Sequence, residues 1–298
     1  MTISSPPRTL SEAGRLFNEA LRNQASEEVI DQIVEQTTKL CHGSFFPFIK
    51  EFSQSPFPGN IILFNRVFAS ISKKLKTDPL SGRLLYQIDL NDEAVGYIIG
   101  TVHDSTHTLG QNAAVNSDPL FHDTVRKCKA LVTELGGLST GLDGALVKTA
   151  HMCGIPVFAL ETEAFQNDIT KKIISKKKQH IKEMTTEVLE RFNYAASSPD
   201  LFTTLGLYSY LTCDIGELAT IKNMDSEFEN CIQRVRHEDW LTSPMTKIPG
   251  LEIMLQPSQH TPLCIAIDAM DLFGEDGIIK KLSSGSFTIS FKGDAQTG

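Results

Sequence analysis

The chain has 298 residues and a mass of 32.9 kDa, enough for one large domain or for a domain with an extension, because a single core stops growing near about 250 to 300 residues. Its 28 basic and 36 acidic side chains give a net charge of −8, which repels nucleic-acid backbones, so we expect no nucleic-acid partner. The content of 41% hydrophobic and 21% charged residues excludes a disordered chain.

The six cysteines include no CxxC pair, and several lie within apolar runs, which predicts reduced thiols in a cytosol-like compartment. Residues 1–8 lack the charged and apolar regions of a secretory signal. We therefore expect a cytoplasmic protein, or one exported without a classical signal peptide. The apolar stretch at 201–213 is too short for a bilayer, which asks for roughly 20 residues, so no transmembrane span is predicted.

The first 80 residues predict a helical N-terminal extension. One helix is expected to begin with Ser11 as its cap, and a second is expected to begin at Ser26. Proline and glycine in the segment 76–82 end this pattern, so we place a domain boundary near residue 80.

From residue 83 the pattern changes to short β-type runs. Residues 84–89 and 95–100, joined at Asn91-Asp92, predict a hairpin. Three short apolar runs bounded by turn residues have the character of buried parallel strands, namely 131–134, 157–160 and 263–267.

Helices are expected between these strands. Gly154 and Pro156 end a helix predicted at 141–152, while unbroken helical spacing predicts a long helix at 167–196 and another at 215–236. The order of elements predicts an α/β domain at 81–285, with a central mixed, largely parallel sheet and flanking helices, followed by a C-terminal tail at 286–298.

The segment Gly100-Thr-Val-His103-Asp104 follows a predicted strand, so His103 and Asp104 are expected at the carboxyl end of that strand, where ligands collect in α/β sheets. An imidazole there can ligate a metal or take a proton, and Gly100 allows close approach of the backbone. The alternative is a structural hydrogen-bonding histidine. His103 and His107 also have the spacing of zinc-peptidase ligands, but the segment lacks their glutamate and their helix.

Two glutamates occupy equivalent places on neighbouring strands. Glu134 ends the run at 131–134, and Glu161 follows the run at 157–160. We expect both on one edge of the sheet, where a carboxylate pair can bind a divalent cation or divide acid and base roles. The alternative is that each caps a helix or lies on the surface.

The last predicted strand leads into Asp268-Ala-Met-Asp271-Leu-Phe-Gly274-Glu-Asp-Gly277. This order predicts a tight turn and the start of a helix, with Asp271 near the same edge of the sheet. The alternative is an ordinary turn that caps a helix.

Two basic features have competing interpretations. Lys222-Asn223 could direct a cation and an amide toward this edge, although a helical lysine is usually only solvated. The basic segment 171–182 could lie against an anionic membrane surface, but acidic residues soon after it weaken that hypothesis.

The order of these motifs resembles that of the TraB/GumN/Tiki family. The resemblance runs over residues 84–282 and rests on five motifs, which are Gly100-Thr-Val-His103, Leu131-Val-Thr-Glu134, Leu160-Glu161-Thr-Glu-Ala-Phe-Gln166, Lys222-Asn223, and Asp268-Ala-Met-Asp271-Leu-Phe-Gly274-Glu-Asp-Gly277. It implies an α/β fold related to erythromycin-esterase and ChaN-like proteins, with peptides as the substrate class, because some members are metal-dependent peptide hydrolases.

Carried over by position, His103 matches the histidine of the family's GTxH motif, and Glu134 and Glu161 match its strand-end acids. Lys222 stands where an arginine is usual, and Asp271 stands where the second motif, GxxH, has its histidine. An aspartate can still hold a divalent ion, but it lacks the proton chemistry of a neutral imidazole. Lysine also lacks the bidentate fork of arginine.

The resemblance leads us to expect a metal-dependent hydrolase that cleaves a peptide or protein. A divalent ion (Mn, Co or Zn) would be held by His103, Asp271 and one or both of Glu134 and Glu161. The remaining carboxylate would act as the base and Lys222 would stabilise the oxyanion, with Asn223 as a further catalytic residue. The expected substrate-binding residues are Gly100, Asp104, His107, Gln166, Gly274 and Gly277. The alternatives are a catalytically impaired member that binds a peptide or protein without turnover, and haem binding by analogy with the ChaN-like proteins.

Overall fold

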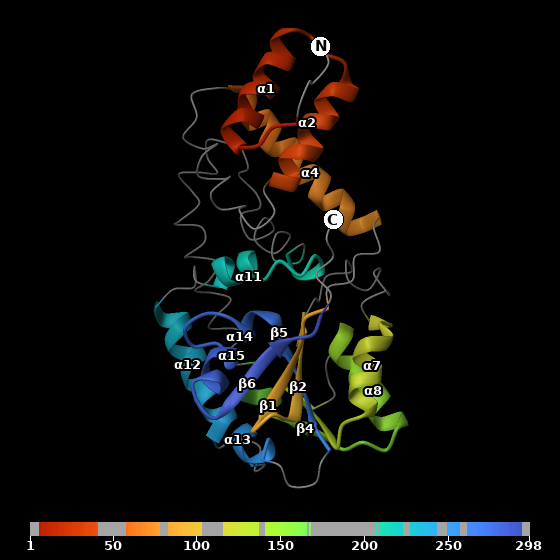
Figure 1. Cartoon of the computed structure of the whole chain (residues 1–298), viewed down its shortest axis with the longest axis vertical. Coiled ribbons are helices and arrows are strands. Elements are labelled where there is room, and N and C mark those ends of the chain that lie inside the picture. The colour runs from red at the N-terminus through yellow and green to blue at the C-terminus, as the bar shows by residue number, and fades with distance from the viewer. Residues whose placement is uncertain are drawn as a thin grey trace. The chain divides into compact units, whose positions relative to one another are not determined.

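The computed structural model describes residues 6–40, 58–77, 83–102, 116–136, 141–165, 167, 207, 209–222, 227–242, 249–256 and 261–293 (Figure 1). Contacts among its residues divide the chain into two units. The first contains the helices that precede residue 78, and the second contains the sheet and most of the remaining helices.

Three helices pack against one another in the first unit, α1 (Leu10–Arg22), α2 (Glu27–Leu40) and α4 (Pro58–Thr77). Each presents an apolar stripe at helical spacing, as Ala13 and Phe17 do on α1, and these stripes are buried. The predicted helical character of this region is therefore confirmed for its described residues.

The cap of α1 is Thr9 and not Ser11, so that detail of the prediction is wrong. The Thr9 side chain accepts a hydrogen bond of 3.2 Å from the Glu12 backbone N–H, and its φ of −137° is the extended backbone that an N-cap needs. Ser11 lies inside the helix instead.

The second unit is organised by a six-stranded mixed sheet in the order β4-β3-β5-β2-β1-β6, which confirms the predicted α/β class. The predicted hairpin is formed by β1 (Leu85–Leu90) and β2 (Glu93–Thr101), which pair antiparallel. Asn91 and Asp92 join them with φ of 52° and 64°, the left-handed backbone that two-residue hairpin turns require.

Part of the sheet is parallel. The parallel part runs from β4 (Val157–Ala159) at one edge through β3 (Ala130–Thr133) and β5 (Leu263–Asp268) to β2. The three predicted strands coincide with β3, β4 and β5. The first five residues of β5 are buried, because parallel strands are covered on both faces.

Helices flank this sheet on both sides. Figure 1 shows α7 (Pro119–Arg126) and α8 (Gly141–Met152) on one side, and α12 (Glu227–Thr242) and α13 (Leu251–Met254) on the other. The bounds of α8 match the prediction, and Gly154 beyond its end has a φ of 68°, which favours glycine.

Three expectations meet different outcomes. The single helix predicted at 215–236 is wrong, because the structure has two helices there, α11 (Ile215–Lys222) and α12. Within the segment predicted as a C-terminal tail, Phe287–Phe291 forms β6, which pairs antiparallel with β1. The long helix predicted at 167–196 lies outside the described residues apart from position 167, and the basic segment 171–182 lies outside them entirely.

After β5 the chain makes two short helices, α14 (Ala269–Leu272) and α15 (Ile278–Ser283), as the predicted turn and helix start require. Gly274 lies between them with a φ of 88°, and Gly277 is the N-cap of α15. A side chain at Gly277 would collide with the carbonyl oxygens of Leu272 and Phe273, so only glycine fits this turn. Among the helices that the structure describes, none is long and apolar enough to span a membrane.

Candidate functional site

Three acidic side chains follow three parallel strands at the same edge of the sheet. Glu134 comes directly after β3, Glu161 comes two residues after β4, and Asp271 lies on α14, which follows β5. The pairing of the first two strands continues past their ends, because the Glu161 N–H donates to the Glu134 carbonyl at 2.9 Å. The carboxyl ends of these strands therefore bring acids together from positions up to 137 residues apart, since 271 − 134 = 137.

The guanidinium of Arg236 lies among these three carboxylates. Its Nε donates to Glu161 Oε1 at 2.7 Å, and its two terminal nitrogens lie 3.4 Å from Glu134 Oε2 and 3.5 Å from Asp271 Oδ2. All four side chains are at least nine-tenths buried. We call these four residues the carboxylate cluster.

Neighbours on α12 fix the orientation of this arginine. Gln233 Oε1 accepts a hydrogen bond of 2.8 Å from Arg236, and the guanidinium carbon lies 4.8 Å from the centre of the Trp240 ring. The Trp240 indole N–H donates to Glu161 Oε1 at 2.9 Å. The same oxygen thus accepts from both Arg236 and Trp240, which leaves Glu161 little freedom to turn.

Burial and charge move the pKa values of two cluster members in opposite directions. Burial raises the pKa of the Glu161 carboxyl, and the hydrogen bond from Arg236 only partly offsets this effect. Burial acts in the same sense on Asp271, but the charge of Arg236, together with that of Lys222, holds the pKa of Asp271 well below its usual range. Glu161 is therefore the carboxyl that binds a proton more readily, and Asp271 is the one that stays ionised.

Within the carboxylate cluster, one oxygen has no hydrogen-bond partner among the described residues. Glu161 Oε2 is buried and makes no such contact, whereas Glu134 Oε1 accepts from the Asp268 N–H at 2.8 Å and Glu134 Oε2 faces Arg236. A buried oxygen without a partner is costly in a folded protein, so it marks Glu161 as a position where a ligand or water would be stabilised.

His237 connects the carboxylate cluster to a pocket. Its Nδ1 lies 2.6 Å from the Asp276 backbone oxygen, which can only accept, so Nδ1 carries the hydrogen. Its Nε2 lies 3.3 Å from Asp271 Oδ1 but is not aligned for a hydrogen bond. The ring is fully buried and rests against Trp240, with ring centres 5.1 Å apart.

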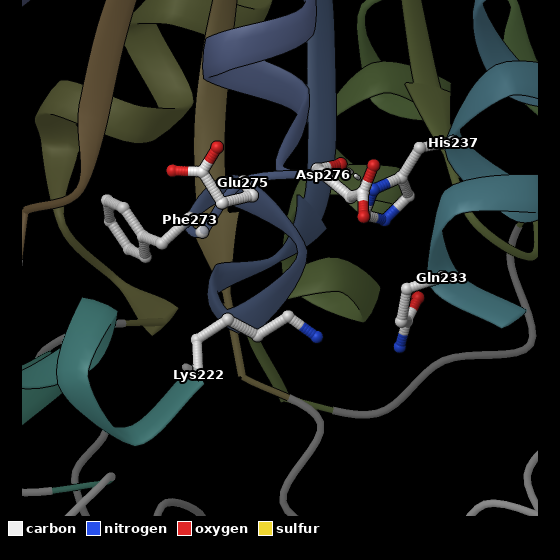
Figure 2. Close-up of a pocket in the computed structure, with 7 residues that line it drawn as sticks. Lys222, Gln233, His237, Phe273, Glu275 and Asp276 are labelled. Atoms are coloured by element: carbon white, nitrogen blue, oxygen red, sulfur yellow. Dashed lines mark hydrogen bonds between the residues drawn. The ribbon is translucent and has the colours of Figure 1, made fainter. Parts of the chain in front are cut away.

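The pocket has a volume of about 250 Å³ and lies beside this histidine (Figure 2). In Figure 2, Lys222 enters it from the end of α11, Gln233 and His237 enter from α12, and the turn after α14 closes it from another side. It is lined by Lys222, Gln233, His237, Phe273, Gly274, Glu275 and Asp276.

The structure brings together four of the predicted site residues. Glu134, Glu161 and Asp271 contact one arginine, and Lys222, which is 5% exposed, lines the pocket and lowers the pKa of Asp271 through its charge. Their roles in catalysis or binding stay predictions.

The predicted glycines differ in their surroundings. Gly274 lines the pocket, while Gly277 serves the turn described above. At Gly100 a side chain would meet Leu272 and Leu84 at 2.9 and 3.0 Å, so this glycine permits close packing of the core. Nothing in its described surroundings points to a ligand there.

Five predicted site residues lie outside the described residues, namely His103, Asp104, His107, Gln166 and Asn223. Within the residues that are described, no group of three or more His, Cys, Asp or Glu side chains is arranged to hold a metal ion. The three cluster carboxylates face a guanidinium instead, so they do not fit a metal by themselves. A divalent ion would need His103 as a further ligand.

The sequence did not single out Arg236, His237 or Trp240. Arg236 lies in a stretch of α12 that also contains Arg234, Glu238 and Asp239, so it resembles an ordinary solvated charge. The available signal was Trp240 four residues after Arg236, because residues at that spacing share a helix face. A tryptophan at that spacing can stack on the arginine, and its large apolar surface favours burial of that helix face.

Comparison of the chain with models of protein families, with curated protein sequences and with solved structures finds no match.

Proposed function

We propose that this chain is a hydrolase that cleaves a peptide or protein, and that its reaction takes place at the carboxylate cluster and the adjoining pocket. The observation that carries the proposal is Glu161, a buried carboxyl with a raised pKa. One of its oxygens has no hydrogen-bond partner in the described part of the chain, and it lies beside Arg236 at the carboxyl ends of the parallel strands. Perturbed carboxyls are concentrated at functional sites, and this edge is where α/β folds bind ligands. The peptide as a substrate class comes from the resemblance to the TraB/GumN/Tiki family.

Glu161 is the best candidate for the general base. Both oxygens of Glu134 are engaged, and Asp271 is held ionised by its cationic neighbours, which makes it a weak base. Glu161 has an oxygen without a hydrogen-bond partner among the described residues, and burial raises its pKa. Since Glu161 is only 2% exposed, the reaction requires the site to open around it.

The proposed reaction is hydrolysis of an amide bond. A water oxygen attacks the carbonyl carbon and gives its proton to Glu161 Oε2, and the carbonyl oxygen becomes an oxyanion stabilised by the Lys222 ammonium. The C–N bond then breaks, and Glu161 returns the proton to the leaving nitrogen. The products are a carboxylic acid, which ionises, and an amine.

The divalent metal stays a prediction beside this proposal. His103 and one or more of Glu134, Glu161 and Asp271 would hold it, and when bound it would lower the pKa of its water. Measurement of Mn, Co and Zn in the purified protein, and in the variant His103→Ala, tests this prediction. We expect a stoichiometric metal in the first and its loss in the second, and a metal-free but active protein would refute it.

A second candidate is a protein that binds a peptide in this pocket without turnover. It is favoured by Arg236, which contacts all three carboxylates and so already links the members of the cluster to one another.

Incubation of the full chain with a diverse peptide library, followed by mass spectrometry of the products, tests the two candidates. A hydrolase yields cleaved peptides, and Lys222→Met slows cleavage about 100- to 1,000-fold, as removal of one oxyanion donor does. Lys127→Met, a matched change at an exposed lysine, leaves the rate unchanged. A folded protein that retains peptides without cleaving any would favour binding alone.

A further inference from the structure

The pocket beside the carboxylate cluster is lined by a buried nitrogen atom that has no hydrogen-bond partner among the described residues. His237 lines the pocket, and its Nε2 has no hydrogen-bond partner in the described structure although the ring is fully buried. Because Nδ1 donates to the Asp276 carbonyl, a neutral ring presents a lone pair at Nε2. Asp271 Oδ1, 3.3 Å away, is an acceptor as well. The buried Nε2 acceptor therefore needs a donor, and the carboxylate oxygen beside it favours a donor that carries a positive charge.

The surroundings favour a positively charged donor. Asp276 and Glu275 add carboxylates to the pocket wall, and the ring of Phe273 adds an aromatic surface. Carboxylates and aromatic faces both attract an ammonium ion. Lys222 is the one positive charge among the described residues that line the pocket, and it would repel a ligand ammonium placed next to it. In Figure 2, Lys222 enters the pocket from α11 and His237 enters from α12.

The volume of the pocket limits the ligand. About 250 Å³ lies below the roughly 300 to 1,000 Å³ of pockets that take drug-sized ligands, so the pocket suits one end of a longer molecule. A peptide end that carries an ammonium group has a carbonyl oxygen three bonds away. That oxygen is a natural acceptor for the Lys222 ammonium.

We propose that this pocket binds the N-terminal ammonium group of a peptide, with His237 Nε2 and Asp271 Oδ1 as acceptors and with Lys222 on the carbonyl oxygen of the first residue. The inference deepens the proposed function, on which it rests for the peptide as a ligand, and makes this chain selective for peptides with a free amino end. The Phe273 ring then packs against the first side chain of the peptide.

Calorimetric titration of the full-length variant Glu161→Gln with two probes tests the proposal, because we expect this variant to cleave its ligand too slowly to disturb the titration. The probes are pentaalanine and N-acetyl-pentaalanine. We expect the free amine to bind at least about 10-fold more tightly, as charge-assisted hydrogen bonds imply. Equal affinity for both probes, or no binding of either, would overturn the proposal.

A third probe identifies the source of the ammonium group. N-acetyl-pentaalanine with a lysine in its third position has an ammonium only on a side chain. If it binds as tightly as pentaalanine, the pocket recognises lysine side chains and the assignment to the peptide end is wrong.

Variants of the pocket wall complete the test, each combined with Glu161→Gln. His237→Phe keeps an aromatic ring and removes the acceptor, so it should abolish the preference for the free amine. Asp276→Asn keeps the backbone carbonyl that holds His237 and should lower that preference about two- to fivefold, because a partly exposed charge is screened. Glu252→Gln on α13 is the matched control and should change nothing. If Asp276→Asn behaves as this control does, the proposed acidic wall plays no part and the proposal fails.

These outcomes separate the inference from the proposed function. Cleavage of N-acetylated and free peptides at equal rates would leave the hydrolase and remove the inference. Preference for free amines in binding, with no cleavage by the unmodified protein, would leave the inference and remove the hydrolase.

Discussion

Two arginine–glutamate pairs in this molecule have nearly equal hydrogen-bond lengths, but the pKa of the glutamate moves in opposite directions. Arg66 bonds to Glu27 at 2.8 Å in the helical unit, and Arg236 bonds to Glu161 at 2.7 Å at the edge of the sheet. The Glu27 side chain is 76% exposed and that of Glu161 is 1% exposed. The hydrogen bond from Arg66 lowers the pKa of Glu27, whereas burial raises the pKa of Glu161 despite the same kind of partner.

The difference shows that burial decides how much an ion pair contributes to stability and in which direction the pKa of its carboxyl moves. An exposed pair is solvated and contributes little to stability, because water already stabilises both charges. A buried pair has lost that water, so each charge depends on its partners and its pKa moves. Three buried acids around one arginine are a costly arrangement, which is one reason to assign them a function.

Removal of each arginine gives the largest contrast. Arg236→Met keeps the length of the side chain but leaves buried carboxylates without compensation, so we expect a loss of about 3–5 kcal/mol in the free energy of unfolding. Arg66→Met should cost less than about 1 kcal/mol. Urea unfolding of both variants measures this difference, and equal losses would contradict the role given to burial.

The pH dependence of stability should carry opposite contributions from two members of the carboxylate cluster. The raised pKa of Glu161 means that protonation favours the folded state, so its contribution grows as the pH falls toward about 4.3. The lowered pKa of Asp271 means that its stabilisation is complete above about 3.9 and is lost as the pH falls below that value. The expected profile of unfolding free energy rises on mild acidification and then falls, by on the order of 1 kcal/mol per pH unit.

Two variants test which carboxyl causes the rise in the unfolding free energy and which causes the fall. Glu161→Gln should remove the rise, and Asp271→Asn should remove the fall, while Glu27→Gln should leave the profile nearly unchanged because Glu27 is exposed. A profile with the same shape in Glu161→Gln as in the unmodified protein would contradict the assignment.

Trp240→Phe tests the hydrogen bond from the Trp240 indole to Glu161, whose contribution to stability we expect to be smaller than that of Arg236. It retains an aromatic face for Arg236 but removes the indole N–H that donates to Glu161. We expect a loss of about 1–3 kcal/mol from the missing hydrogen bond to a charged group, together with a further rise in the pKa of Glu161. Thermal unfolding checks the first effect, and a loss below about 0.5 kcal/mol would show that this bond does not hold the carboxyl.

The smallest effect belongs to the cap of α1 in the helical unit. Thr9→Ala removes the acceptor for the Glu12 N–H and should cost about 1 kcal/mol. Ser11→Ala is the matched control and should cost nothing measurable, because Ser11 is not the cap. If the two variants are equally destabilised, the beginning of α1 is misassigned.

Local patterns were sufficient to predict much of the sheet. The hairpin follows from alternation around Asn91-Asp92, and β3, β4 and β5 follow from short apolar runs between turn residues. Strand β6 was missed although Phe287–Phe291 alternates apolar and polar residues, because the run is short and its place in the sheet depends on pairing with β1. The break between α11 and α12 was missed because helical spacing continues across it.

The candidate site also has residues that the sequence predicts and a residue that only the folded structure reveals. Strand ends are readable from the sequence, so Glu134, Glu161 and Asp271 could be expected on one edge. Arg236 could not, because its partners are 102, 75 and 35 residues away and only the folded chain shows that its charge is buried. Lys222 was expected to be the cation of the site, and the structure adds Arg236 as the side chain that contacts all three acids.

The most direct test of the account compares peptide hydrolysis by Glu161→Gln and Glu27→Gln. Each replaces a carboxylate that pairs with an arginine by its neutral isostere, one buried and one exposed. We predict that the first variant loses about 100- to 10,000-fold in kcat while it remains folded, and that the second retains full activity. A folded Glu161→Gln with an unchanged rate would contradict the central claim that this buried carboxyl transfers the proton.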